Sequence, residues 1–139
     1  MRIEENTLTA EQFILLFESV GWKSPAPPQV EKALKNSVVV FSAVENERVI
    51  GMARLIGDRS MSYYIKDLAI LPTEQGKGIG RALIEQIERF ILAETPKGEA
   101  VSLELISSKG KELFYEKFGF EQRPCEYDGA GMMKMLRAK

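Results

Sequence analysis

The residues with the clearest chemical potential form a glycine-rich run, Gln75-Gly76-Lys77-Gly78-Ile79-Gly80-Arg81. The run lies between an apolar stretch that ends at Pro72 and a helical pattern that follows Gly80. Backbone N–H groups and the positive end of a helix dipole converge at such a junction and favour a phosphate or pyrophosphate, and Lys77 and Arg81 add positive charge. The alternative is a tight turn that uses glycine only for its access to positive φ.

This run does not fit the two common nucleotide-binding patterns. A P-loop requires Gly-Lys followed by Ser or Thr after a four-residue gap from a first glycine, and the run has no such arrangement. Leu83 stands where the third glycine of a dinucleotide-binding fingerprint would be. The pattern therefore predicts an anion-binding turn without identifying the anion.

The composition narrows the chemistry that the chain can perform. Its 139 residues include no histidine and one cysteine, Cys125. Without imidazole there is no Ser-His-Asp or Cys-His unit and the usual zinc sites are missing, so we expect no metal. Proton transfer then falls to carboxylates, tyrosine, lysine, the thiol or water. The net charge of -1 argues against a nucleic-acid partner held by a basic surface.

The same sequence features predict the compartment and the domain count. A lone cysteine suits a reducing compartment. Met1–Glu5 has no apolar core of a signal peptide, and no run approaches the ~20 apolar residues of a membrane span. We therefore expect a cytoplasmic protein with no membrane partner, built as a single domain over residues 1–139.

The elements that must position the glycine run follow from hydrophobic periodicity. We expect one helix from the capping residue Thr9 to Gly21, and others at 28–35, from the glycine run to Pro96, and at 110–118. The predicted strands are 38–44, 48–56, 63–70, 101–106, 120–123 and 132–136. A hairpin followed by strand, helix and strand predicts a mixed-sheet α/β or α+β domain.

Two segments resemble the GNAT superfamily of acetyl-CoA-dependent N-acetyltransferases. Ile65–Leu83 is similar to the family's strand and Gln/Arg-x-x-Gly-x-Gly/Ala loop, and Phe114-Tyr115-Glu116-Lys117-Phe118-Gly119-Phe120 to its Phe-Tyr-x-x-x-Gly-Phe segment. Gly21-Trp22 and Gly51-Met52-Ala53-Arg54 resemble small single-domain members. The resemblance implies a mixed, mostly antiparallel central sheet with a parallel βαβ cofactor cleft, flanked by about four helices.

The resemblance also implies an acyltransferase that moves an acetyl group from acetyl-CoA to a primary amine of a small molecule or peptide, by direct attack in a ternary complex. Residues that match the family's cofactor contacts are those of the strand, the loop and the turn before the last helix: Leu68, Ala69, Ile70, Gln75, Gly76, Lys77, Gly78, Ile79, Gly80, Arg81 and Ser108. Ser108 stands where many members carry asparagine.

The acid and the base are the remaining catalytic roles. Tyr115 matches the family's general acid, although it could instead simply pack against Phe114 and Phe118. Asp67 and Glu104 are candidate bases because both lie on strands that flank the expected cleft, with Asp58 or water as alternatives.

Three questions stay open at the level of sequence. The acceptor could be a small amine, an aminoglycoside, a polyamine or a peptide N-terminus, and a homodimer is possible. Trp22 is either part of the acceptor site or a core aromatic residue, and Glu126 and Asp128 either bind a cationic amine or are simply solvated. The alternative functions are a non-catalytic acyl-CoA-binding sensor or interaction domain of the same fold, and a nucleotide-binding domain of another type.

Overall fold

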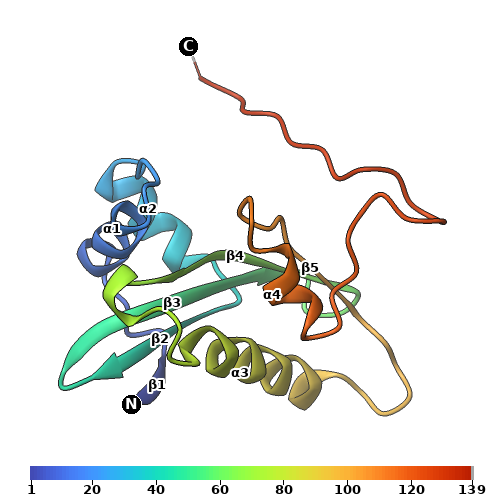
Figure 1. The fold of residues 1–139 in the computed structure, drawn as a ribbon, viewed down its shortest axis with the longest axis horizontal. Coiled ribbons are helices and arrows are strands. Elements are labelled where there is room, and N and C mark those ends of the chain that lie inside the picture. The colour runs from blue at the N-terminus through green and yellow to red at the C-terminus, as the bar shows by residue number, and fades with distance from the viewer. Residues whose placement is uncertain (139) are drawn as a thin grey trace. The chain divides into compact units, whose positions relative to one another are not determined.

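A computed structural model describes residues 1–138 of the chain (Figure 1). Within this range the chain divides into two compact units, Met1–Leu105 and a second unit that begins at Ile106. The first unit contains the sheet with three α-helices, and the second contains one short helix, α4 (Glu112–Glu116).

The first unit is built on a mixed sheet with the strand order β1-β2-β3-β4-β5. Neighbouring strands from β1 to β4 are antiparallel, and β5 is parallel to β4. The strands are β1 (Arg2–Glu5), β2 (Val39–Glu45), β3 (Arg48–Gly57), β4 (Ser62–Ile70) and β5 (Ser102–Glu104). The predicted mixed, mostly antiparallel sheet with one parallel βαβ unit is therefore confirmed.

Helices cover the sheet on both sides: α1 (Ala10–Ser19) and α2 (Pro27–Lys35) lie on one side and α3 (Ile79–Glu94) on the other (Figure 1). The predicted capping box at the start of α1 is present, because Thr9 and Gln12 bond each other's backbone N–H groups. The predicted apolar face of α3 is buried at Leu83, Ile87 and Ile91. Burial of these faces against the sheet stabilises each helix far more than its intrinsic propensity does.

Gly51 on β3 allows the end of β4 and the start of α3 to approach each other closely. A Cβ atom at this position would lie 2.8 Å from Cδ1 of Ile70 and 3.1 Å from Cγ2 of Ile79. Ile70 ends β4 and Ile79 begins α3, so the strand before the loop and the helix after it meet over Gly51. The sequence motif Gly51-Met52-Ala53-Arg54 thus has a steric reason for its first residue.

The observed strands differ from the predicted ones at both ends of the chain. The sequence gives little sign of β1, which is short and mostly charged and is held by pairing with β2. The strands expected at 120–123 and 132–136 are missing from the described part of the second unit. A strand needs a paired neighbour, and the run Met132-Met133-Lys134-Met135-Leu136 lacks the alternation that would give it one buried face.

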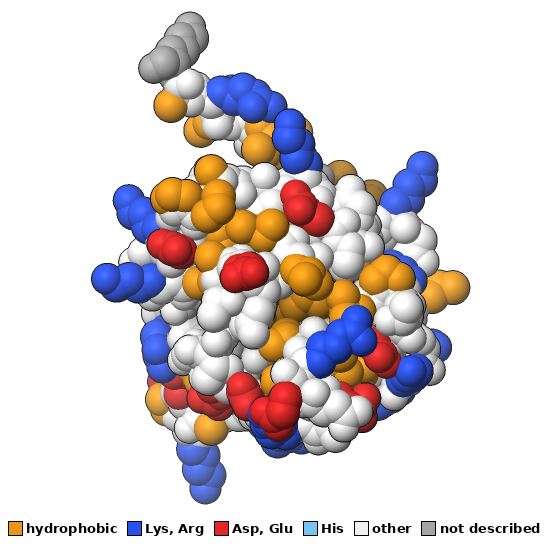
Figure 2. Space-filling view, turned by 90° about the vertical axis from the view of Figure 1, so that its left-hand side faces the viewer, with side chains coloured by type: hydrophobic (Ala, Val, Ile, Leu, Met, Phe, Trp, Pro, Cys, Tyr) orange, Lys and Arg blue, Asp and Glu red, His pale blue; other side chains and the backbone are white. Residues whose placement is uncertain are grey.

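The surface carries both signs of charge. Lys and Arg side chains are interspersed with Asp and Glu across the face in view in Figure 2, consistent with the near-zero net charge. None of the helices within residues 1–138 has the length and apolar character needed to cross a membrane.

We expect Gly51→Val to lower the free energy of unfolding by about 2 kcal/mol, because a side chain larger than the available space must displace Ile70 or Ile79. Urea titration measures this loss. The matched change Gly129→Val adds a side chain where no described atom lies within 4 Å of the Cβ position, and should change stability by less than about 0.5 kcal/mol. Equal losses in the two variants would contradict the close-approach role of Gly51.

Candidate active site

A β-bulge interrupts β4 near its centre. Between the cross-strand pairs Lys66↔Arg54 and Ala69↔Met52, β4 has one residue more than β3. Asp67 lies in this bulge with a φ of 60°, in the left-handed region that few non-glycine residues adopt. The bulge changes which backbone groups face each side of the strand.

Beyond the bulge, the backbone of β4 presents hydrogen-bonding groups away from β3. The N–H of Leu71 donates to the carbonyl oxygen of Ile50 at 2.9 Å, so Leu71 faces β3. Hydrogen-bonding direction alternates along a strand. Ala69 therefore also faces β3, whereas Leu68 and Ile70 direct their backbone groups toward the opposite edge.

That opposite edge is paired with β5 only at its beginning. The parallel ladder joins Ser62–Tyr64 to Ser102–Glu104, and the N–H of Ser102 donates to the carbonyl oxygen of Met61 at 2.9 Å. Among the described residues of the first unit, no strand continues alongside residues 65–70 on this side. An extended ligand with amide groups can therefore add to this edge as a strand would.

Glu104 lies at the point where β4 and β5 separate. Its strand partner is Tyr64, the last residue of the parallel ladder. A depression of about 330 Å³ is lined by Tyr64 and Glu104 together with Ile56 and Asp58. No ion pair found within residues 1–138 includes Glu104.

Glu104 accepts a long hydrogen bond from Oγ of Ser102 at 3.4 Å, whereas the other two carboxylates considered as bases have closer partners. Nε of Arg54 donates to Oδ2 of Asp67 at 2.8 Å, and both side chains are largely buried, with 16% and 11% of their surfaces exposed. Asp58 accepts hydrogen bonds from the backbone N–H groups of Ser60, Met61 and Ser62, which hold the pKa of its carboxyl below the ordinary value. Asp58 thus closes the turn between β3 and β4.

Arg54 was not predicted as a site residue. It lies on β3 opposite Lys66, the residue just before the bulge in β4. Its Nη1 also donates to Oγ of Ser37 at 3.3 Å. The sequence signal that could have identified it is an arginine flanked by buried strand residues. A largely buried guanidinium requires a partner.

The glycine run begins directly after β4 and is tied back to it. Nε2 of Gln75 donates to the carbonyl oxygen of Ile70 at 3.1 Å, so Gln75 fixes the loop to the end of the strand. Gly76 and Gly78 have φ values of 79° and 83°, as the tight-turn alternative requires. No described atom lies within 4 Å of an ideal Cβ at either glycine, so both glycines border open space.

The run ends at the N-terminus of α3. Gly78 is the N-cap residue, and no described side chain caps this helix, so the first-turn N–H groups are available to an anion. The two predicted cations carry partners: Nζ of Lys77 lies 2.7 Å from Oε2 of Glu74, and Nη1 of Arg81 lies 3.8 Å from Oε1 of Glu85. The backbone therefore carries more of the anion-binding capacity than the sequence indicates.

Tyr115 lies on α4 in the second unit. Its ring contacts those of Phe114 and Phe120 at centroid distances of 5.1 and 5.9 Å, so the predicted packing with Phe114 is confirmed. Burial raises the pKa of Tyr115 to about 12, which keeps the phenol protonated at neutral pH. Ser108 belongs to the turn before this helix, where its carbonyl oxygen accepts the N–H of Lys111 at 3.0 Å.

Two residues considered for the acceptor have ordinary structural contacts. The ring of Trp22 packs edge-on against Phe17 at a centroid distance of 5.0 Å. The carboxylate of Asp128 is paired with Arg123, with Nε and Oδ2 separated by 2.9 Å.

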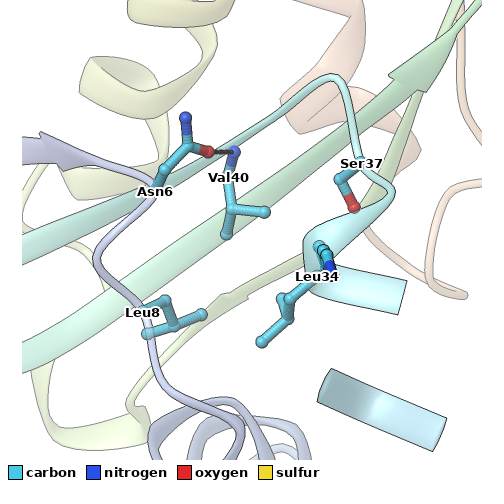
Figure 3. A pocket seen from close by; sticks show the side chains of 6 residues that line it. Asn6, Leu8, Leu34, Ser37 and Val40 are labelled. Carbon is cyan, nitrogen blue, oxygen red and sulfur yellow. Dashed lines mark hydrogen bonds between the residues drawn. The ribbon is translucent and has the colours of Figure 1, made fainter. Parts of the chain in front are cut away.

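A pocket of about 310 Å³ lies between the segment before α1 and the end of α2 (Figure 3). Leu8 and Leu34 line it from these two segments, and Asn6 accepts a hydrogen bond from the N–H of Val40 at 3.0 Å. Ser37, the partner of Arg54, also lines it. The described lining includes none of the residues that the sequence predicts for the site.

The first unit therefore places Glu104, Asp67, the open edge of β4, the glycine run and the start of α3 one after another along β4 and its continuation. Tyr115 and Ser108 belong to the second unit. The geometry of the first unit suits an elongated ligand that combines amide groups with a phosphate.

Comparison with known proteins agrees with this geometry. The chain is 31% identical over 113 residues to the uncharacterized N-acetyltransferase ycf52 of Pyropia yezoensis, an alignment that covers 78% of this chain and 63% of the relative. The chain spans between 45% and 63% of the length of three curated relatives.

Solved structures share the fold. A GNAT-family acetyltransferase from Streptococcus pneumoniae is 29% identical, with a TM-score of 0.79 over 99% of this chain and 98% of that one. An aminoglycoside 6'-N-acetyltransferase solved with coenzyme A shares the fold at 16% identity, with a TM-score of 0.58 over 68% of this chain and 57% of that one. The family model of the acetyltransferase (GNAT) domain matches residues 6–137, and the chain therefore belongs to the GNAT acetyltransferase family.

Proposed function

We propose that this protein is an N-acetyltransferase that transfers an acetyl group from acetyl-CoA to a primary amine by direct attack in a ternary complex. The observation that carries the proposal is the continuity of the open β4 edge with the glycine run and the uncapped start of α3. Along this path, strand-like pairing and phosphate binding follow one another in the order of the amide-containing arm and pyrophosphate of CoA.

The residues present fit acetyl-CoA. The open space at Gly76 and Gly78 accommodates a group that any larger side chain would crowd. First-turn N–H groups of α3 are suited to the pyrophosphate, and Lys77 and Arg81 lie beside them. Leu68, Ala69 and Ile70 would line the arm, with Leu68 and Ile70 offering backbone groups; Gln75 would hold the loop in place. The aminoglycoside acetyltransferase of the same fold was solved with coenzyme A, which supports this ligand.

Acetyl-CoA supplies an activated thioester: as the amine nitrogen bonds to the acetyl carbon, the C–S bond breaks, the amine loses a proton and the CoA sulfur gains one. This chain then needs to orient the reactants and move two protons. A β4 N–H at the open edge, that of Leu68 or Ile70, polarises the thioester carbonyl. The Tyr115 hydroxyl donates a proton to the departing sulfur and recovers one from solvent.

Glu104 accepts the amine proton in our proposal, directly or through a water molecule. Its position at the separation of β4 and β5 and the hollow beside it support this role. Asp67, the other candidate, would first have to release Arg54. Glu104 has no cationic partner among the described ion pairs that it would have to release before it meets the amine.

The acceptor is a primary amine, of a class that family membership does not specify. The aminoglycoside acetyltransferase acts on an aminoglycoside, as its name states. Asp128, considered as a group that would attract a cationic amine, already has Arg123 as its partner, so it contributes little free charge. We also propose that both units form one catalytic domain, because the family model continues through both of them.

Release of CoA thiol, screened across small amines, aminoglycosides, polyamines and peptides, tests the activity.

With an accepted amine, we expect Tyr115→Phe to lower kcat by about 100-fold with little change in acetyl-CoA affinity, because a proton donor is lost but its ring packing is kept. The matched variant Tyr127→Phe alters an exposed tyrosine of the same unit and should keep full activity. Unchanged turnover in Tyr115→Phe would remove Tyr115 from the mechanism. Because burial raises the pKa of Tyr115 to about 12, its ionisation should not limit the rate at pH values well below that.

Gly78→Ala should weaken CoA binding about 10-fold or more. An alanine at a φ of 83° is strained, and its methyl group would enter the open space of the loop. Calorimetric titration with CoA measures the affinity. Gly98→Ala introduces the same strain at a φ of 87°, also with no described atom near the Cβ position, in the turn after α3. Equal affinities in the two variants would argue against pyrophosphate binding at the loop.

Glu104→Gln should lower kcat/KM by about 100-fold, because an amide cannot accept the amine proton. The exposed Glu99→Gln provides a control of equal chemistry. An unchanged kcat/KM in Glu104→Gln would instead assign the proton to water or to Asp67.

A further inference from the structure

We propose that Arg54 and Asp67 are positioning residues that hold the β4 bulge and thereby set which backbone N–H groups face the acetyl-CoA edge. This inference rests on the proposed function and adds two residues to it. It assigns Asp67 a role that differs from the proton acceptor that its position on the strand suggests.

The backbone at Asp67 requires a local restraint. A φ of 60° in the middle of a strand is unfavourable for an L-residue, and aspartate tolerates this region better than most because its short side chain can bond nearby groups. Its carboxylate is fixed by Nε of Arg54 at 2.8 Å. The contact therefore ties the side chain of the strained residue to the neighbouring strand.

Arg54 is well placed to serve as the fixed end of this contact. It pairs through its backbone with Lys66, the residue just before Asp67, so it spans the start of the bulge. Nη1 donates to Oγ of Ser37, and Oγ of Ser37 donates in turn to the carbonyl oxygen of Ala33 on α2. The guanidinium is thus connected to β4 through Asp67 and to α2 through Ser37, which limits its freedom to follow a shift of Asp67.

The bulge decides which groups of β4 face outward. With the extra residue present, Ala69 faces β3 and the N–H groups of Leu68 and Ile70 face the open edge. If Asp67 adopted extended geometry and paired regularly with β3, the pairing of the residues after it would shift by one. Different backbone N–H groups would then face the open edge. The carbonyl of Ile70 would then also turn away from Gln75, which holds the glycine run.

The contact needs an acceptor oxygen and tolerance of positive φ, but it does not need a titrating carboxylate. Asparagine supplies both, because its amide oxygen can accept from Nε of Arg54 and it is enriched in the left-handed region. Alanine supplies neither. A base, in contrast, cannot be replaced by asparagine, so this pair of substitutions distinguishes the two roles.

The experiment compares Asp67→Asn, Asp67→Ala, Arg54→Met and the double variant Arg54→Met/Asp67→Ala in the thiol-release assay. We expect Asp67→Asn to keep kcat within about threefold and to keep its pH profile. Asp67→Ala and Arg54→Met should lose about 10- to 100-fold in kcat, since misplacement of a reacting group is costly, with a smaller change in the KM for acetyl-CoA. The double variant should be no worse than either single variant, because both remove one contact.

Arg2→Met is the matched control. It removes an arginine that bonds Glu4 and Glu47 on the β1 edge of the sheet, and it should leave kcat unchanged. If Asp67→Asn is as impaired as Asp67→Ala, or if Asp67→Ala keeps wild-type kcat, the proposal is overturned. Should Arg54→Met fail to fold, the comparison of asparagine with alanine at position 67 still decides the matter.

Amide hydrogen exchange of residues 65–70 in the free protein gives a readout that does not depend on activity. Exchange at Ala69, whose N–H faces β3, should be faster in Asp67→Ala and Arg54→Met than in wild type, Asp67→Asn and Arg2→Met. If wild type releases no thiol with any amine, the proposed function fails, and the exchange data still test the positioning role. Unchanged exchange in both Asp67→Ala and Arg54→Met would overturn it.

Discussion

The structure of the candidate site depends on one extra residue in β4. That residue breaks the pairing with β3 at Asp67 and resets the alternation of every residue that follows in the strand. Leu68 and Ile70 present backbone groups to an edge that β5 leaves open, and the carbonyl of Ile70 becomes the attachment point for Gln75. The bulge therefore determines both the edge and the loop.

The glycines act in two different ways around this bulge. Gly51 has no side chain because the ends of β4 and α3 meet over it, with Ile70 and Ile79 within 3.1 Å of its Cβ position. Gly76 and Gly78 instead adopt positive φ beside open space. One glycine brings protein segments together, whereas the other two leave room for a ligand, and both effects serve the same junction between strand and helix.

Much of the first unit could be predicted from its sequence because its signals are local. The capping residues Thr9 and Gln12 and the buried stripe of α3 lie within a few turns of helix, and the positive φ of Gly76 and Gly78 follows from residue type. The contact between Arg54 and Asp67 could not be predicted, because its partners lie on different strands and meet only through a register that the bulge creates. Pairing likewise decides β1, a strand that was not predicted, and the region 132–136, where the predicted strand does not form.

The absence of histidine leaves proton transfer to groups whose local partners differ. Arg54 holds the carboxylate of Asp67, three backbone N–H groups hold that of Asp58, and no ion pair in the described part of the chain involves Glu104. Glu104 accepts a long hydrogen bond from Oγ of Ser102 at 3.4 Å, so its carboxylate is held less firmly than the other two, which supports its proposed role as the proton acceptor. The phenol of Tyr115 is held protonated by burial, which suits a donor. Contacts alone thus distinguish three chemically similar acids and one phenol, and these differences support the separate roles that we propose for them in a chain without imidazole.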